Sequence, residues 1–127
     1  MKLRIKGDSL RLRLTRPELA RLEAGDEVAE TIHFGAAAEE SLRYRLAAAE
    51  QDAPVAVGFG AHTISVTISL EKMGVWADES EVGVYAELET GAGGRLEVAV
   101  EKDFKCLDRR DEQDEDAFPN PQAGKTC

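Results

Sequence analysis

The side chains best suited to chemistry in this sequence are its few sulfur and imidazole groups. Two cysteines and two histidines would be enough to coordinate a tetrahedral zinc ion, and they are Cys106, Cys127, His33 and His62. None of them has the C-x-x-C or H-x-x-x-H spacing that is typical of zinc sites. Since a free cysteine is often a small buried apolar side chain, we predict that the protein has no cofactor and keep zinc as the weaker alternative.

No catalytic motif accompanies these groups. The sequence lacks the G-x-S-x-G, P-loop, H-E-x-x-H and G-x-G-x-x-G patterns. Its glycine-rich run at 91–94 precedes a predicted strand, whereas a dinucleotide-binding loop opens a helix. Cys106 could form a thiol–imidazole pair with a histidine, but the sequence offers no third group to orient that pair. We therefore predict no catalytic residues and favour a non-enzymatic protein over an enzyme.

The first 14 residues carry the most regular charge pattern. Apolar and cationic residues alternate on both sides of Gly7 and Asp8, which predicts a two-stranded hairpin with one aliphatic and one cationic face. Because like charges on neighbouring strands repel, we expect acidic groups nearby. Three interpretations stay open for the cationic face: solvation or internal pairing, a protein partner, and an anion or RNA. Its five side chains are Lys2, Arg4, Lys6, Arg11 and Arg13.

The elements that position these groups can be predicted along the rest of the domain. A capping box at residues 15–18 starts a short helix, and Ser69 can cap a second one that carries Met73 and Trp76. Glu30 is the one charged residue on an otherwise apolar strand face. Alternation predicts further strands at residues 27–34, 41–48, 55–59, 64–70, 82–88 and 96–100. The alanines at residues 41–48 leave a helix possible for that segment.

These segments predict a single β-rich domain over residues 1–107, of the mainly β (α+β) class. About eight antiparallel strands would form a barrel or a rolled sheet with two short capping helices, since short strands that recur every 8–12 residues are typical of such folds. A parallel α/β fold would need longer helices between its strands. The length of 127 residues also suits one domain.

An acidic tail is predicted to follow this domain, at residues 108–127. Six carboxylates fall between Asp108 and Asp116, without the spacing of a calcium-binding EF-hand loop. We expect the tail to be partly disordered or docked on the domain. A disulfide between the two cysteines is not expected in a reducing compartment. Docking would use Phe104, Cys106, Phe118, Pro119 and Cys127.

The charge balance limits the classes of partner. The formal net charge is −9, which argues against nucleic acid, since nonspecific binding to it depends on surplus cations. Residues 1–22 nevertheless hold seven cations against two acids, so the molecule is charge-polarised. No run is apolar enough for a secretion signal or a membrane span. We therefore expect a cytoplasmic protein with no membrane partner, present as a monomer or a weak homodimer.

The two ends of the chain resemble a family of short bacterial proteins of unknown function. The resemblance lies in KLRIKGDSLRLRLT at residues 2–15, EKDFKCL at residues 101–107, and the tail from FPNP at residue 118 to Cys127. It implies a small, soluble, stand-alone bacterial protein and a shared role for segment 101–107 and the tail cysteine. It assigns no activity and no site residues.

Together these observations predict a non-enzymatic binding or accessory protein. We expect it to use its charge-polarised surface against an unidentified protein partner. One alternative is a protein that binds a small ligand or zinc through Cys106 and the histidines. The other is an RNA contact through the cationic face of the N-terminal hairpin.

Overall fold

The computed structural model describes residues 1–78, 80–91, 93–104 and 118–119. Within them the chain forms eight strands, two α-helices and one short 3₁₀-helix, so the predicted mainly β fold class is confirmed. In chain order the elements are β1 (Lys2–Lys6), β2 (Ser9–Leu14), α1 (Arg16–Glu23), β3 (Val28–His33), η1 (Ala38–Glu40), β4 (Ser41–Ala49), β5 (Val55–Gly60), β6 (Thr63–Ser69), α2 (Leu70–Trp76), β7 (Gly83–Gly91) and β8 (Gly94–Lys102).

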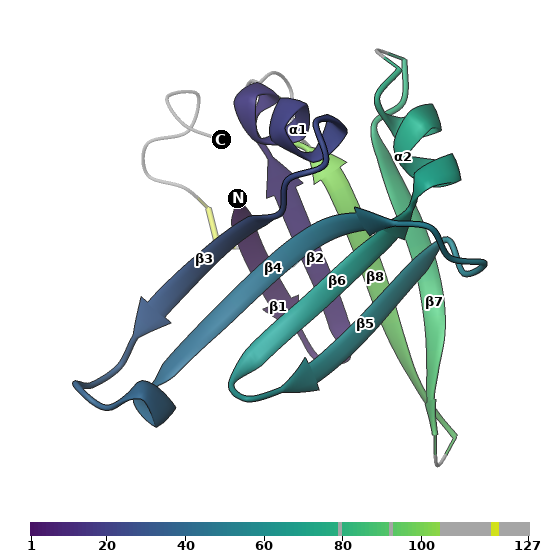
Figure 1. The fold of residues 1–127 in the computed structure, drawn as a ribbon. Helices are drawn as coiled ribbons and strands as arrows, with labels where there is room; N and C mark the ends of the chain where they lie inside the picture. The colour runs from purple at the N-terminus through teal and green to yellow at the C-terminus, as the bar shows by residue number, and fades with distance from the viewer. Residues whose placement is uncertain (79, 92, 105–117, 120–127) are drawn as a thin grey trace.

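The strands form two four-stranded sheets that face each other (Figure 1). The strand order is β1-β2-β8-β7 in one sheet and β3-β4-β6-β5 in the other. Each sheet consists of two antiparallel hairpins whose inner strands run parallel, β2 with β8 and β4 with β6. Within the described residues the strands do not close into the predicted barrel, and antiparallel pairing throughout is wrong for the two central pairs.

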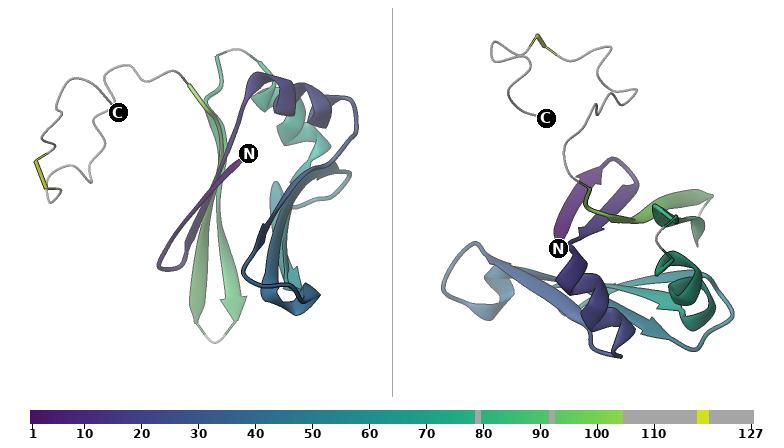
Figure 2. Two further views of the ribbon diagram at one scale, coloured as in Figure 1. Left: turned by 90° about the vertical axis from the view of Figure 1, so that its left-hand side faces the viewer. Right: turned by 90° about the horizontal axis from the view of Figure 1, so that it is seen from above.

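Both α-helices carry the chain from one sheet to the other. Helix α1 leads from β2 to β3, and α2 leads from β6 back to β7. They lie at the same end of the two sheets, as the side and top views in Figure 2 show. Strand β8 therefore meets β2 only after both crossings. Local alternation predicts the strands of each hairpin, but tertiary packing decides how two hairpins join.

The core lies between the sheets and is mostly aliphatic, as the composition predicts. Alternate residues of the strands point inward, and the helices add side chains that cover one end of this interior. The largest fully buried side chains are Trp76, Leu12, Leu14, Leu22, Leu46, Ile68, Val28, Val55, Val66 and Val100. Because side chains alternate across a strand, the remaining strand residues form two outer faces, one on each sheet.

Both predicted helix starts are confirmed. Glu18 Oε1 accepts a hydrogen bond from the backbone N–H of Thr15 at 2.9 Å, as a capping box requires. Ser69 Oγ accepts one from the backbone N–H of Lys72 at 3.1 Å. The alanine-containing segment, for which a helix was possible, forms β4. Among the described residues no helix combines the length and apolar character that crossing a bilayer requires.

Candidate functional site

The outer face of the β1-β2-β8-β7 sheet gathers most of the charged residues that the sequence points to, and we term it the charged face. The strand register aligns its side chains in three rows that run across the sheet. Cations occupy the β1–β2 half, and acids occupy much of the β8–β7 half. In the order β1, β2, β8, β7 the rows are Lys2, Arg13, Glu101, Gly83; then Arg4, Arg11, Ala99, Tyr85; then Lys6, Ser9, Glu97, Glu87.

Glu101 is the main acidic partner of the hairpin cations. Its Oε1 atom lies 3.4 Å from the Nε atoms of both Arg11 and Arg13. Its Oε2 atom accepts a hydrogen bond from the Tyr85 hydroxyl at 2.7 Å. At the same end Lys2 Nζ lies 3.1 Å from a carboxylate oxygen of Asp103. The acidic groups expected near the cationic face are thus found on β8 and just after it.

Tyr85 is held in place by the same carboxylate. Burial and the hydrogen bond to Glu101 raise the pKa of Tyr85 to about 12, so its hydroxyl stays protonated as a donor at neutral pH. The room for this contact comes from Gly83, the outward neighbour of Glu101 on β7. A Cβ atom on Gly83 would lie 2.6 Å from the backbone oxygen of Val100 and 3.1 Å from the Tyr85 hydroxyl.

We expect Gly83→Ala to lower the free energy of unfolding by about 1–3 kcal/mol, the usual cost of overpacking. The backbone oxygen of Val100 cannot move aside as a flexible side chain would. Urea unfolding followed by circular dichroism measures the change. Gly74→Ala is the matched control, because its Cβ meets nothing within 4 Å and alanine favours a helix by up to about 1 kcal/mol. Equal stability of Gly83→Ala and the unmodified protein would contradict this packing.

A hollow of about 510 Å³ opens on the charged face. It exists because Ser9 and Ala99, on the two central strands, are small and lie among long side chains. Leu10, Ala86 and Val98, which face inward on β2, β7 and β8, also line it. One side is cationic and the other is acidic with one aromatic ring, and the outward side chains around it are Arg4, Lys6, Arg11, Tyr85, Glu87 and Glu97.

Two charges that line the hollow have no ion-pair partner among the described residues: Lys6 and Glu97. They belong to the same row and are separated by Ser9. The Ser9 hydroxyl donates a hydrogen bond to the backbone oxygen of Lys6 at 2.6 Å, so it is already partnered within the protein. By contrast, Glu87 pairs with Arg95 at 2.7 Å. A cation and an acid are therefore left facing the same open space.

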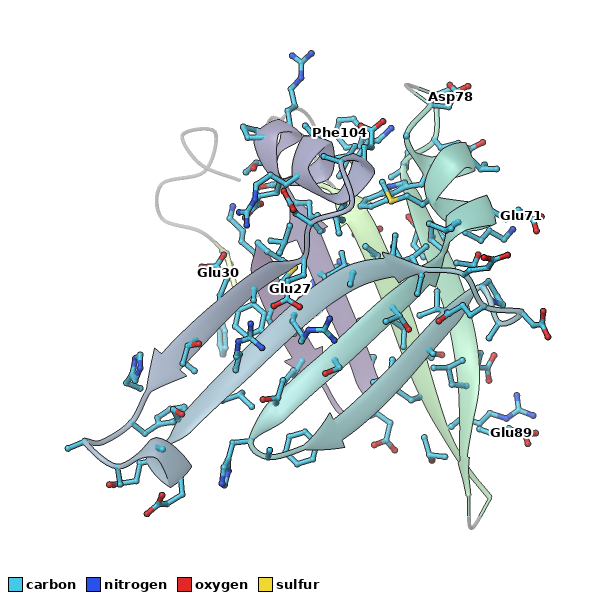
Figure 3. The ribbon with its side chains drawn as sticks, in the orientation of Figure 1. Glu27, Glu30, Glu71, Asp78, Glu89 and Phe104 are labelled. Carbon is cyan, nitrogen blue, oxygen red and sulfur yellow. The ribbon has the colours of Figure 1, made fainter. Side chains whose placement is uncertain are left out.

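The outer face of the other sheet has a small charge cluster that is already paired. Glu27 Oε1 lies 2.6 Å from Arg43, and its Oε2 lies 2.7 Å from Arg45. Hydrogen bonds from Arg45 and Arg43 lower the pKa of Glu27. Figure 3 shows Glu27 above β4, near the start of β3. This cluster leaves no unpaired acid to receive a ligand, so we do not consider it the candidate site.

Glu30, the charged residue on an apolar strand face, has a structural role. Its Oε2 atom lies 2.6 Å from the α-ammonium group of Met1, and Figure 3 labels Glu30 on β3. Glu18 also accepts a hydrogen bond from this ammonium group, and the Tyr44 hydroxyl donates to the Met1 backbone oxygen at 3.3 Å. The lone acid in the pattern was a visible signal, but its partner is 29 residues away.

Only two of the four candidate zinc ligands lie among the described residues. His33 ends β3 and His62 lies in the β5–β6 turn, and both side chains are exposed. Cys106 and Cys127 lie outside the described residues. Within the described part of the chain, no group of three or more His, Cys, Asp or Glu side chains is placed to hold a metal ion. The prediction of no cofactor and its weaker alternative, zinc held by these four residues, both stay untested.

The predicted tail docking also stays a prediction. Phe104 follows β8 and is half-exposed, and Pro119 is exposed. Phe118, the proposed apolar anchor, is 96% exposed. The two cysteines that would complete the docked tail, like most of residues 105–127, fall outside the residues that the structure describes.

Comparison with known proteins supplies a family but no activity. No curated protein matches the chain, and no solved structure matches it. The chain matches the model of a family of unknown function, DUF7009, over residues 1–122, which agrees with the resemblance inferred from the two ends of the sequence. The chain therefore belongs to this family of unknown function.

Proposed function

We propose that the protein is a non-enzymatic binding or accessory protein and that it presents the charged face to a protein partner. One observation carries the proposal: Lys6 and Glu97 line the same hollow without an ion-pair partner among the described residues. On the outer face of the other sheet, by comparison, Glu27 is paired with both Arg43 and Arg45. An unpaired charge in a hollow is available to a partner at little cost, because no existing ion pair must be broken.

The mixture of charges supports a protein partner over RNA. Glu101 already offsets two arginines, and Glu87 and Glu97 lie on the other side of the hollow. A polyanion laid across the face would meet these acids, and like charges brought together weaken binding. Tyr85 adds an aromatic ring whose position is fixed by Glu101. Tyrosine and arginine are the residue types that commonly anchor protein interfaces.

Site-specific photocrosslinking in the source cells tests the proposal. A photoreactive phenylalanine analogue at Glu89 lies on the same face of β7 as Glu87, at the edge of the charged face (Figure 3). The same analogue at Phe34, which follows β3 and is 71% exposed, is the control. We expect a discrete protein adduct from position 89 alone. The crosslinked protein, once purified, should bind the unmodified chain saturably.

Charge reversal then tests whether the adduct forms at the charged face. Lys6→Glu should remove the adduct and weaken binding of the purified partner at least about tenfold, or about 1.4 kcal/mol. Thr31→Glu, on the outer face of the other sheet, should leave both unchanged. Adducts that are equal at positions 89 and 34, or that disappear with ribonuclease treatment, would refute a protein partner on the charged face.

A further inference from the structure

The hollow on the charged face has two walls of opposite charge. Arg4, Lys6 and Arg11 line its β1–β2 side, and Glu87 and Glu97 line its β8–β7 side. Lys6 and Glu97 are two strands apart, which places their backbones about 10 Å from each other. Only the small Ser9 lies between them in that row. The hollow is therefore a dipolar site with a fixed direction across the sheet.

A ligand of a single charge sign fits such a site poorly. An acidic segment would gain from Lys6 but would lie against Glu97, and a basic segment would meet the reverse arrangement. Like-charge contacts of this kind discriminate against wrong partners. A segment that carries both signs satisfies both walls at once and leaves neither charge unpaired in the contact.

We infer that the hollow binds a partner segment in which an acidic and a basic side chain lie within about 10 Å of each other on one surface, the acidic one facing Lys6 and the basic one facing Glu97. This inference rests on the proposed function and names the chemistry of the partner. Tyr85 borders the site, and because Glu101 holds its hydroxyl, its ring is already oriented for packing against aliphatic parts of the segment.

Three short peptides test the pattern directly. They share one neutral scaffold with blocked ends and differ only at two positions, which carry one Glu and one Lys, two Glu, or two Lys. Their affinities for the full chain are measured by fluorescence anisotropy at low and at physiological salt. We expect the mixed peptide to bind at least about tenfold more tightly than either of the others, with a preference that weakens as salt rises.

Single charge reversals should then switch the preference in opposite directions. In Lys6→Glu both sides of the row become acidic, so the peptide with two Lys should bind best. In Glu97→Lys both sides become basic, so the peptide with two Glu should bind best. Thr31→Glu, on the other sheet, should keep the preference for the mixed peptide. Circular dichroism and urea unfolding of each variant show whether a change in binding reflects a change in folding.

Two outcomes would overturn the dipolar pattern. One is equal or tighter binding of the peptide with two Glu by the unmodified chain, which would make the hollow a simple anion site. The other is that none of the three peptides binds. In either case the photocrosslinking from position 89 decides separately whether the charged face has a protein partner, so failure of the pattern and failure of the proposed function are distinguishable.

Discussion

Trp76→Ala is expected to lower the free energy of unfolding by about 3–5 kcal/mol, as is typical when a buried aromatic residue is truncated. Trp76 is fully buried at the end of α2. Its Nε1 atom donates to the backbone oxygen of Val82 at 3.2 Å, just before β7 begins. The residue thus fills the core at the point where the chain crosses from one sheet back to the other. Urea unfolding followed by far-ultraviolet circular dichroism measures the loss.

Two further variants separate the causes of this loss. Trp76→Phe keeps an aromatic ring but removes the indole N–H that donates to the Val82 oxygen, which still accepts a hydrogen bond from the Lys102 backbone N–H at 3.0 Å. The lost hydrogen bond should account for at most about 1 kcal/mol of the total. Val75→Ala changes the preceding residue, whose side chain is 51% exposed, and should stay within about 0.5 kcal/mol of the unmodified protein. If Trp76→Ala unfolded at the same urea concentration as Val75→Ala, this account of the core would be wrong.

Converting the α-ammonium group of Met1 into an amide is the second large effect that we expect. A Gly-Ser extension before Met1 makes this change and should cost about 1–3 kcal/mol, the range for losing hydrogen bonds to charged groups. The ammonium group donates to Glu18 and to Glu30, at 2.6 Å for the latter, while the Met1 side chain is buried. The same extension at the C-terminus is the control and should leave the stability unchanged.

The pH dependence of stability gives an independent test of this ion pair. Burial by itself would lower the pKa of the α-ammonium group, but its hydrogen bonds to Glu18 and Glu30 outweigh that and raise it. Burial likewise opposes ionisation of Glu18, yet its hydrogen bonds to the ammonium group and Thr15 lower its pKa. The stabilisation is therefore complete between about pH 4.5 and about pH 8, the ordinary pKa values of the two groups.

Outside that range the two groups act in opposite directions. As the pH rises through the raised pKa of the ammonium group, the group loses its proton and the stabilisation is lost. As the pH falls through the lowered pKa of Glu18, the carboxylate gains a proton with the same result. Melting temperatures between pH 3 and pH 10 should show both losses in the unmodified chain. An alkaline loss of the same size in the chain extended by Gly-Ser would contradict this assignment.

Segment 101–107 begins at the charged face, and its residues 101–104 lie in the described part of the chain. The sequence indicates a strand end and a resemblance shared with the tail, and β8 does end at Lys102. Glu101 lies on the charged face, where its carboxylate contacts Arg11, Arg13 and Tyr85. Alternation along β8 places Glu101 outward, but its cationic neighbours are 88 to 90 residues earlier in the chain.

Much of the fold can be predicted from the sequence because its signals are local. The capping box that starts α1, the Ser69 cap of α2 and the alternation within each strand all depend on residues a few positions apart. The common face of the five hairpin cations follows in the same way, since a period of two and one tight turn are sufficient to predict it. These features need no knowledge of how the sheets are assembled.

The tertiary structure alone decided the candidate site and the ion pair at Met1. Strand β8 pairs with β2 in parallel because α1 and α2 carry the chain to the second sheet and back. That pairing brings Glu101 beside Arg13 and places Ser9 and Ala99 among longer side chains, which opens the hollow. Contacts between residues distant in sequence depend on which hairpins pack together. The core that the two sheets share stabilises that arrangement, and no local sequence pattern specifies it.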